Sequence, residues 1–200
     1  MENQQAIKHL KKDPILKKVI QSTEKEIKSS LELDIYHFLL DSIVSQQLSI
    51  KVADVIFNRF LDLFPERYPQ PKHLINMDDE ILRNAGLSYR KASYLKNVAL
   101  FALENNIEFE HIQKQSNADL IALFTQIKGV GKWTVQMLLM FPLDRKDVFP
   151  VDDLGIQTNM KKLYNITSEK KELKQDLIKI AENWKPYRTL ASKYIWNYTK

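Results

Sequence analysis

The hydrophobic positions along the chain recur with the spacing of an α-helix. The clearest stripe begins after Asp34 and runs through Ile35, Leu39 and Ile43, so that apolar side chains return to one face every three or four residues. A second stripe predicts a helix over residues 51–64, whose inward side chains are expected to be Val52, Val55, Ile56, Phe60 and Leu63. The whole pattern contains roughly ten such segments and no convincing strand, which predicts an all-α fold.

Prolines and capping residues mark several predicted boundaries in the first half of the chain. Pro14 divides the lysine-rich residues 1–30 into two short helices, because proline has no N–H for a helix interior. Residues 65–74 contain three prolines and are predicted to be a linker. Asn76 is expected to cap the helix that follows, since an Asn side chain accepts readily from first-turn amides.

Composition narrows the class of protein. The chain has 200 residues, no cysteine, a net charge of +5 and a pI near 9.2. The missing cysteines exclude disulfides, thiolate zinc sites and cysteine-ligated iron–sulfur clusters, and the four histidines lack the spacing of metal ligands. The positive charge favours a polyanionic partner, although the lysines of residues 1–30 are interpreted as a solvated face. The sequence has no apolar run of about 18 residues, the length that would span a membrane, and no signal peptide, so we expect a cytoplasmic protein that does not enter a membrane.

The stretch from Leu123 to Ile156 combines the features that suggest chemistry. Gly129 and Gly131, two of only four glycines, lie two apart between helical patterns, which predicts a helix, a tight turn and a second helix. The turn is expected to use φ > 0, and the amides that open the second helix would carry the positive end of its dipole. Such a turn is suited to binding a phosphate.

Two adjacent acids follow the turn. Asp152 and Asp153 come just after Pro150 and open another helical run. Neighbouring side chains at a helix mouth point in different directions, so the two cannot act as a paired acid and base. One is expected to cap the helix while the other faces a cleft; alternatively both only cap the helix and interact with its dipole.

Polar and aromatic side chains elsewhere also leave two interpretations open. The amides of Gln46 and Gln47, at a helix end, either cap a turn or contact base edges and fill a gap in a duplex. Trp133 and Trp196 either belong to the core or form a platform on which a planar ligand stacks.

Four segments together resemble the helix–hairpin–helix (HhH-GPD) DNA glycosylase superfamily, most closely its 3-methyladenine DNA glycosylase II (alkylpurine) branch. They read IKGVGKWTVQMLLMF…DVFPVDDLGI, SIVSQQLS, LRNAGLSYRKASYL and WKPYRTLASKYIW. The resemblance covers about residues 34–198. It implies one glycosylase domain, 1–200, with two helical lobes and the active site in the cleft between them. Lobe one would comprise 1–33 plus 143–200, and lobe two 34–142 with the hairpin at 117–141.

The resemblance also implies roles for particular residues. It makes Asp153 the catalytic aspartate, and it places Trp133, Trp196 and Met137 around the base pocket. It assigns DNA binding to residues of the hairpin and of the preceding glutamine pair, namely Gln46, Gln47, Lys128, Gly129, Gly131, Lys132 and Thr134. In similar enzymes hairpin carbonyls hold a monovalent cation, Na⁺ or K⁺, and the matching residues here are Thr125, Ile127 and Val130.

Departures from the superfamily pattern refine the expected reaction. Trp133 occupies the position of the lysine nucleophile of bifunctional members, and Lys132 lies one residue too early, so no lyase step is expected. No cofactor is expected to be required, apart from a possible Na⁺ or K⁺ ion at the hairpin. Met137 replaces a pocket tyrosine, which suggests a narrower substrate range. The chain lacks the cysteines of cluster-binding branches, and no N-terminal β-lobe is expected.

These observations predict a monofunctional glycosylase that excises alkylated purines of the 3-methyladenine and 7-methylguanine type during base excision repair. Its partner would be double-stranded DNA with alkylated bases, and we expect a monomer. Two alternatives remain at this stage. One is a non-catalytic hairpin module that binds DNA or senses lesions, and the other is a glycosylase for deaminated bases. A pure binder has no use for an acid at the position of Asp153, and a neutral base needs more electrostatic assistance to leave.

Overall fold

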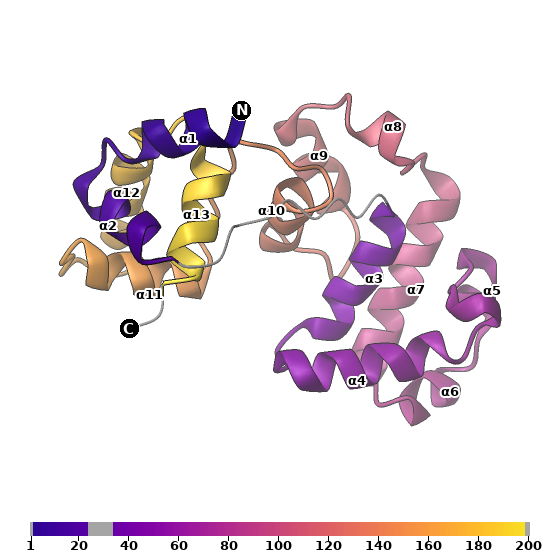
Figure 1. The fold of residues 1–200 in the computed structure, drawn as a ribbon. Helices are drawn as coiled ribbons and strands as arrows, with labels where there is room; N and C mark the ends of the chain where they lie inside the picture. Colours follow the sequence, from indigo (N-terminus) through magenta and orange to yellow (C-terminus); the bar gives the residue numbers. More distant parts are fainter. Residues whose placement is uncertain (1, 24–33, 199–200) are drawn as a thin grey trace. The chain divides into compact units, whose positions relative to one another are not determined.

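The computed structural model describes residues 2–23 and 34–198, and within them the secondary structure is helical with no strand. The predicted all-α fold is therefore confirmed. The chain forms two compact units, one comprising Met1–Ser30 and Leu139–Lys200 and the other Leu31–Leu138 (Figure 1). No described helix is both long and apolar enough to cross a membrane.

The first unit is built from both ends of the chain. Its helices are α1 (Glu2–Leu10), α2 (Pro14–Ser22), α11 (Leu154–Leu163), α12 (Lys170–Glu182) and α13 (Arg188–Trp196). Asp13 caps α2 by accepting from Ile15 and Leu16 N–H, and Pro14 occupies its first turn, so the predicted division at Pro14 is confirmed. The other Asp13 oxygen accepts from Tyr164 Oη at 2.7 Å and Trp184 Nε1 at 3.0 Å. This acid therefore ties the N-terminal helices to the core of the unit.

Apolar side chains from all five helices fill the first unit. They pack into one cluster, to which α2 contributes Leu16 and Val19, α11 contributes Ile156 and Met160, and α12 and α13 contribute Leu177, Trp184 and Ile195. Ile156, in the first turn of α11, belongs to this cluster. The N-cap of α11, Asp153, therefore adjoins the packed core of the unit.

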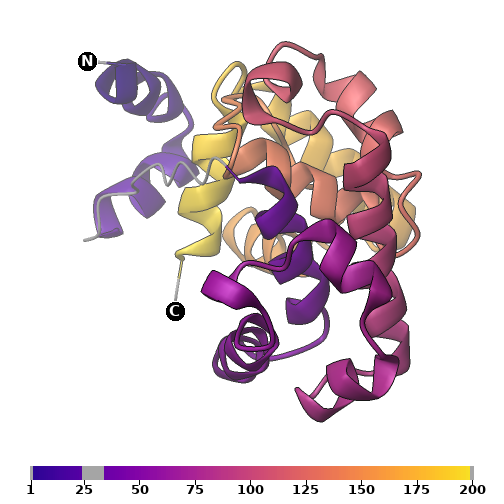
Figure 2. The same cartoon turned by 90° about the vertical axis from the view of Figure 1, so that its right-hand side faces the viewer.

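The second unit is arranged around its longest helix, α7. Its elements are α3 (Ile35–Ser45), α4 (Ile50–Leu61), the 3₁₀ turn η1 (Pro65–Arg67), α5 (Pro71–Asn76), α6 (Asp79–Asn84), α7 (Tyr89–Glu104), α8 (Phe109–Ile112) and α9 (Asn117–Phe124). Helix α10 (Lys132–Met140) starts in this unit, and the boundary between the units falls within it. Helix α7 packs against α3, α5 and α6 (Figure 1, Figure 2).

Three expectations for the second unit were wrong. Residues 65–74 are not a linker, because Pro65 and Pro71 start η1 and α5, where a preset φ favours the first helical turn. Asn76 ends α5 instead of capping the next helix; Asp78 caps α6 and accepts from Glu80 N–H at 2.8 Å.

The third expectation concerned the inward face of α4. It was wrong in part: Phe60 is buried as predicted, but the other buried residues are Ala53 and Phe57, whereas Val52 and Val55 are 46% and 51% exposed. The sequence carries two overlapping apolar stripes here, and α4 buries the one with the larger aromatic area, which stabilises more on burial. The valine stripe is left on the surface.

Candidate active site and nucleic-acid interface

The hairpin begins with a well-capped helix. Ser116 Oγ accepts from Asp119 N–H at 3.2 Å and donates to the Asp119 carboxylate at 2.7 Å, which fixes the first turn of α9. After α9 ends at Phe124, Val130 N–H donates to Ile127 O at 2.9 Å and closes the turn. Local bonds therefore fix the start of α9 and the turn.

The two hairpin glycines serve different purposes. Gly129 has φ +108°, the left-handed region, and a Cβ at this position would lie 2.4 Å from Tyr94 Cγ. Gly131 does not have a positive φ, so the turn enters the left-handed region at Gly129, and the expectation that the turn uses φ > 0 is confirmed there. A Cβ on Gly131 would meet nothing within 4 Å. The space beside Gly131 is therefore open to an approaching ligand.

The second hairpin helix presents its N-terminus at this open position. Val135 N–H donates to Gly131 O at 3.1 Å, so Gly131 precedes the first turn of α10. Lys128 and Lys132 are exposed on either side, and Trp133 is 43% exposed. Helix dipole and lysine charge act together here on any bound anion. Thr134 and Met137 are buried, and a phosphate contact from the Thr134 hydroxyl stays a prediction.

The glutamine pair follows the end of α3. Gln47 is exposed and has φ +60°, a conformation uncommon for a residue with a side chain. The Gln46 amide nitrogen donates to Gly129 O at 3.0 Å. The structure therefore brings one predicted DNA-binding residue directly onto the hairpin.

The two adjacent acids have separate roles. Asp153 is the N-cap of α11, where its Oδ1 accepts from Ile156 N–H at 2.8 Å. Asp152 lies at the surface with its Oδ1 2.6 Å from Lys174 Nζ. The expectation that one acid caps the helix is confirmed, since Asp153 is the cap. The other acid is not free as expected, because the Asp152 carboxylate pairs with Lys174.

A tryptophan holds the candidate catalytic acid from a second direction. Trp196 Nε1–H donates to Asp153 Oδ1 at 2.7 Å, and its ring stacks on Phe141 with centroids 6.1 Å apart and planes at 17°. Gly155 leaves room for this contact, since a Cβ there would lie 3.1 Å from Asp153 Oδ1 and 3.3 Å from Trp196 Cδ1. Two donors therefore fix the orientation of the Asp153 carboxylate.

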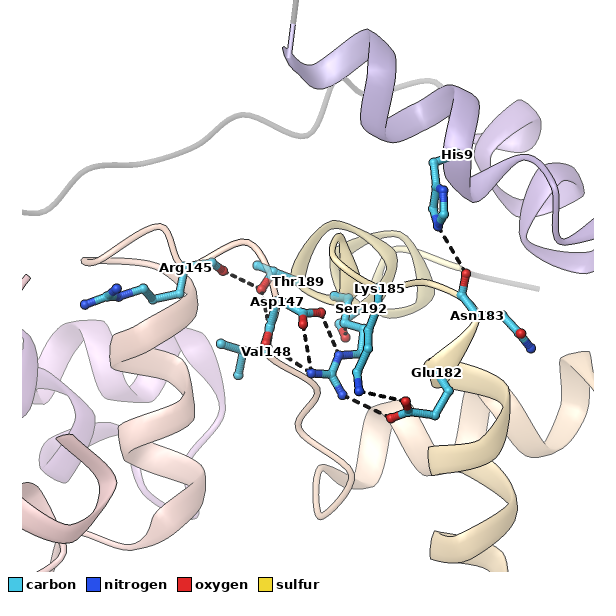
Figure 3. Close-up of polar contacts among 10 residues, drawn as sticks. His9, Arg145, Asp147, Val148, Glu182, Asn183, Lys185, Thr189 and Ser192 are labelled. Carbon is cyan, nitrogen blue, oxygen red and sulfur yellow. Dashed lines mark hydrogen bonds and ion pairs between the residues drawn. The ribbon is translucent and has the colours of Figure 1, made fainter. Parts of the chain in front are cut away.

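The loop before Asp153 is fastened to α13, as Figure 3 shows. Thr189 Oγ1 accepts from Val148 N–H at 3.0 Å and donates to Arg145 O, while Thr189 N–H donates to Lys146 O. Arg188 forms two bonds to the Asp147 carboxylate, at 2.6 and 3.0 Å. Helix α13 thus holds the loop at one end and Asp153 at the other, through Trp196.

Lys193 adds a cation on the same helix. Its Nζ lies 5.0 Å from the centroid of the Phe141 ring that stacks on Trp196, and burial lowers the pKa of the Lys193 ammonium.

The chain matches a family of DNA repair proteins over most of its length. Residues 40–185 match the HhH-GPD superfamily of base excision DNA repair proteins. The chain belongs to this superfamily. It is 40% identical over 167 residues to DNA-3-methyladenine glycosylase 1 of Schizosaccharomyces pombe, covering 82% of this chain and 72% of that protein.

Two solved HhH-GPD structures are also similar. One is S. pombe 3-methyladenine DNA glycosylase in complex with abasic DNA, with TM-score 0.84 and 36% identity over 98% of this chain and all of that chain. The other is a DNA-3-methyladenine glycosidase from Bacillus halodurans, with TM-score 0.80 and 34% identity over 94% of this chain and 85% of that one.

Several residues of this HhH-GPD site were missed by the sequence reasoning. Tyr94, Arg188 and Thr189 act through partners far away in the chain, and no local pattern marks those contacts. Gly155 had a detectable signal, because it is one of only four glycines and follows Asp153 by two residues.

Metal binding by side chains finds no support in the described residues, which hold no group of three or more His, Asp or Glu arranged for an ion. The hairpin carbonyls of Thr125, Ile127 and Val130 are a different type of donor. They follow the C-terminal end of α9, where the helix dipole is negative, and uncharged oxygens there suit a monovalent cation.

Proposed function

We propose that the chain is a monofunctional DNA glycosylase that excises alkylated purines from duplex DNA. The observation that carries this proposal is the Asp153 carboxylate, fixed by Ile156 N–H and Trp196 Nε1–H, in a member of the HhH-GPD superfamily. Two different relatives, from S. pombe at 40% identity and from Bacillus halodurans at 34%, are named a DNA-3-methyladenine glycosylase and a DNA-3-methyladenine glycosidase, which supports the same reaction here.

The reaction adds water across the bond between C1′ of the deoxyribose and the purine nitrogen. Alkylation at N3 or N7 gives the purine a positive charge, so the base leaves as a neutral molecule and needs little acid assistance. Cleavage leaves an oxocarbenium-like sugar, and a carboxylate held in a fixed orientation stabilises that charge without reorganising. Asp153 supplies this carboxylate, and water supplies the hydroxyl at C1′ and releases its other proton to solvent. The products are a neutral free base and an abasic site.

The base must leave the duplex before it reacts, because C1′ is inaccessible inside the stack. Unstacking costs a few kcal/mol and least at damaged pairs. Trp133 and Trp196 offer ring faces on which a cationic purine stacks, a contact that contributes about 1–3 kcal/mol per base. Trp133 also stands at the position of the lysine of bifunctional relatives, so the expected product is an intact abasic strand.

DNA is held through its backbone at the hairpin. The N-terminus of α10, with exposed Lys128 and Lys132, binds a phosphate, and the open side of Gly131 admits it. A Na⁺ or K⁺ ion at the carbonyls of Thr125, Ile127 and Val130 would add positive charge beside that phosphate. We further propose that the protein acts as a cytoplasmic monomer.

A substrate panel tests the proposal. The protein is incubated with duplexes that carry methylated, deaminated or oxidised bases, and abasic sites are then cleaved with alkali. We expect strand breaks in the methylated duplex, release of 7-methylguanine or 3-methyladenine, and no breaks before alkali. Binding without release would identify a non-catalytic module, and release of uracil or hypoxanthine alone would identify a glycosylase for deaminated bases.

A further inference from the structure

Three segments of the second unit meet at the hairpin. They are the loop between α3 and α4, which carries Gln46 and Gln47, the turn from Lys128 to Gly131, and the face of α7 from Lys91 to Asn97. Each segment is bonded to both of the others. The loop and the turn have distinct expected tasks on DNA, since one fills the gap left by a flipped base and the other binds phosphate.

Helix α7 holds the loop through a lysine. Lys91 Nζ donates to Val44 O at 2.6 Å and to Gln46 O at 2.8 Å. These carbonyls belong to the last turn of α3, which lacks N–H partners within the helix and benefits from a cation. Lys91 therefore caps α3 from a neighbouring helix and fixes the backbone just before Gln47.

Helix α7 also holds the hairpin. Asn97 Nδ2 donates to Lys128 O at 3.2 Å, and the Tyr94 ring lies against Gly129 so closely that a Cβ on this glycine would clash. Lys91, Tyr94 and Asn97 lie three residues apart along one helix face. The spacing between loop and turn is thus set by a single rigid helix.

Gln46 closes the arrangement by joining loop and turn directly. Its Nε2 donates to Gly129 O at 3.0 Å across 83 residues of sequence. Its neighbour Gln47 is exposed and has a left-handed backbone conformation. A glutamine whose amide is bonded to the hairpin is poorly placed to contact a base, whereas Gln47 is well placed.

We propose that Gln46 and Lys91 are positioning residues, which lock the loop carrying Gln47 to the phosphate-binding hairpin so that the two engage DNA as one rigid clamp. Binding of the phosphate then places Gln47 at a fixed distance along the strand, where it fills the gap left by the extruded nucleotide. The proposal rests on the proposed base-excision function for its purpose. The coupling itself is a property of the free protein.

The first test measures insertion of the loop into DNA. The probe is a duplex with 2-aminopurine beside a tetrahydrofuran abasic analogue, whose fluorescence rises when the neighbouring stack is opened. We expect Gln46→Met and Lys91→Met each to slow the rise by about fivefold, the factor that corresponds to one net hydrogen bond. The affinity of Lys91→Met for undamaged duplex, which depends on the phosphate contacts, should change by less than about twofold.

Two matched variants control for a nonspecific effect of the substitutions on the protein fold. Lys96 is on the same helix and its Nζ donates to Met77 O and Asp79, away from the loop, while Gln126 Nε2 donates to Ala122 O four residues earlier in the chain. Lys96→Met and Gln126→Met should leave the fluorescence rise unchanged. Equal slowing in a control variant, or a normal rate in Gln46→Met, would overturn the proposal.

The second test uses no DNA and no activity. Amide hydrogen exchange at residues 128–132 should rise about fivefold in Gln46→Met and in the isosteric Gln46→Glu, which cannot donate to Gly129 O. Gln46→Lys restores an N–H donor and should restore protection. Unchanged exchange in both donor-free variants would refute the coupling. A coupled hairpin in a protein that releases no base would refute the proposed function alone.

Discussion

Trp196 Nε1 lies 2.7 Å from Asp153 Oδ1, and the indole therefore shares this oxygen with the helix-capping bond from Ile156 N–H. Trp196 was expected to line the base pocket, and the contact gives its polar edge a second task. Its ring face packs on Phe141 while its N–H orients the carboxylate. Trp196, proposed to line the base pocket, thereby also orients Asp153, the proposed catalytic acid.

Trp196→Phe separates these two tasks. Phenylalanine keeps a ring that packs on Phe141 but cannot donate to Asp153. A hydrogen bond to a charged group is worth about 1.5–3 kcal/mol, so the single-turnover excision rate should fall by about tenfold to a hundredfold. Affinity for abasic DNA should be nearly unchanged. Wild-type excision by Trp196→Phe would show that the indole N–H does not position the acid.

Gly129→Ala and Gly131→Ala should affect different properties, the first the stability of the fold and the second the affinity for DNA. Alanine at Gly129 requires a left-handed conformation, which costs about 1–2 kcal/mol, and its Cβ would clash with Tyr94. Alanine at Gly131 meets no protein atom within 4 Å, but its methyl group would project into the space proposed for a phosphate.

Thermal unfolding and fluorescence anisotropy with an undamaged duplex distinguish the two variants. Gly129→Ala should lower the melting temperature. Gly131→Ala should melt within a degree or so of the wild type, since surface substitutions usually change stability by less than about 0.5 kcal/mol, and should bind the duplex more weakly. Normal DNA binding by Gly131→Ala would show that no phosphate binds at this position.

Thr189→Val tests how the loop before Asp153 is held. Valine matches the shape of threonine but leaves Val148 N–H and Arg145 O, now bonded to the hydroxyl, without that partner. A buried polar group left unsatisfied costs about 1–3 kcal/mol, so the free energy of unfolding in urea should fall by at least that amount. Thr189→Ser keeps the hydroxyl and is the matched control. Equal stability of the Val and Ser variants would contradict the assignment.

Local patterns were sufficient for much of the fold. The break at Pro14 and the left-handed turn at Gly129 depend on neighbours within a few residues, so the sequence already contains their cause. The face of α4 could not be predicted, because the stripe through Val52 and the stripe through Phe57 both fit a helix, and burial against α3 decides between them.

The candidate site was likewise predictable from the sequence only in part. The resemblance to a superfamily singled out Asp153, and the structure adds a physical difference from Asp152, whose carboxylate is paired with Lys174 at the surface. The partners of Gln46 and Trp196 lie 83 and 43 residues away, so no periodicity or spacing could reveal them. Contacts of this range depend on tertiary packing and require the structure.

The central claim is that Asp153 carries the reaction, and its isosteric amide tests it most directly. Asp153→Asn keeps an oxygen for Ile156 N–H and Trp196 Nε1–H, so the fold and the binding of abasic DNA should survive. Asp152→Asn removes the neighbouring acid, whose exposed pair with Lys174 contributes little to stability. It is therefore the matched control.

The measurement is the single-turnover release of 7-methylguanine from methylated duplex by the two variants. Loss of charge stabilisation in the transition state should slow Asp153→Asn by about a hundredfold or more, with Asp152→Asn close to the wild type. Near-normal release by Asp153→Asn, or equal loss in both variants, would contradict the account.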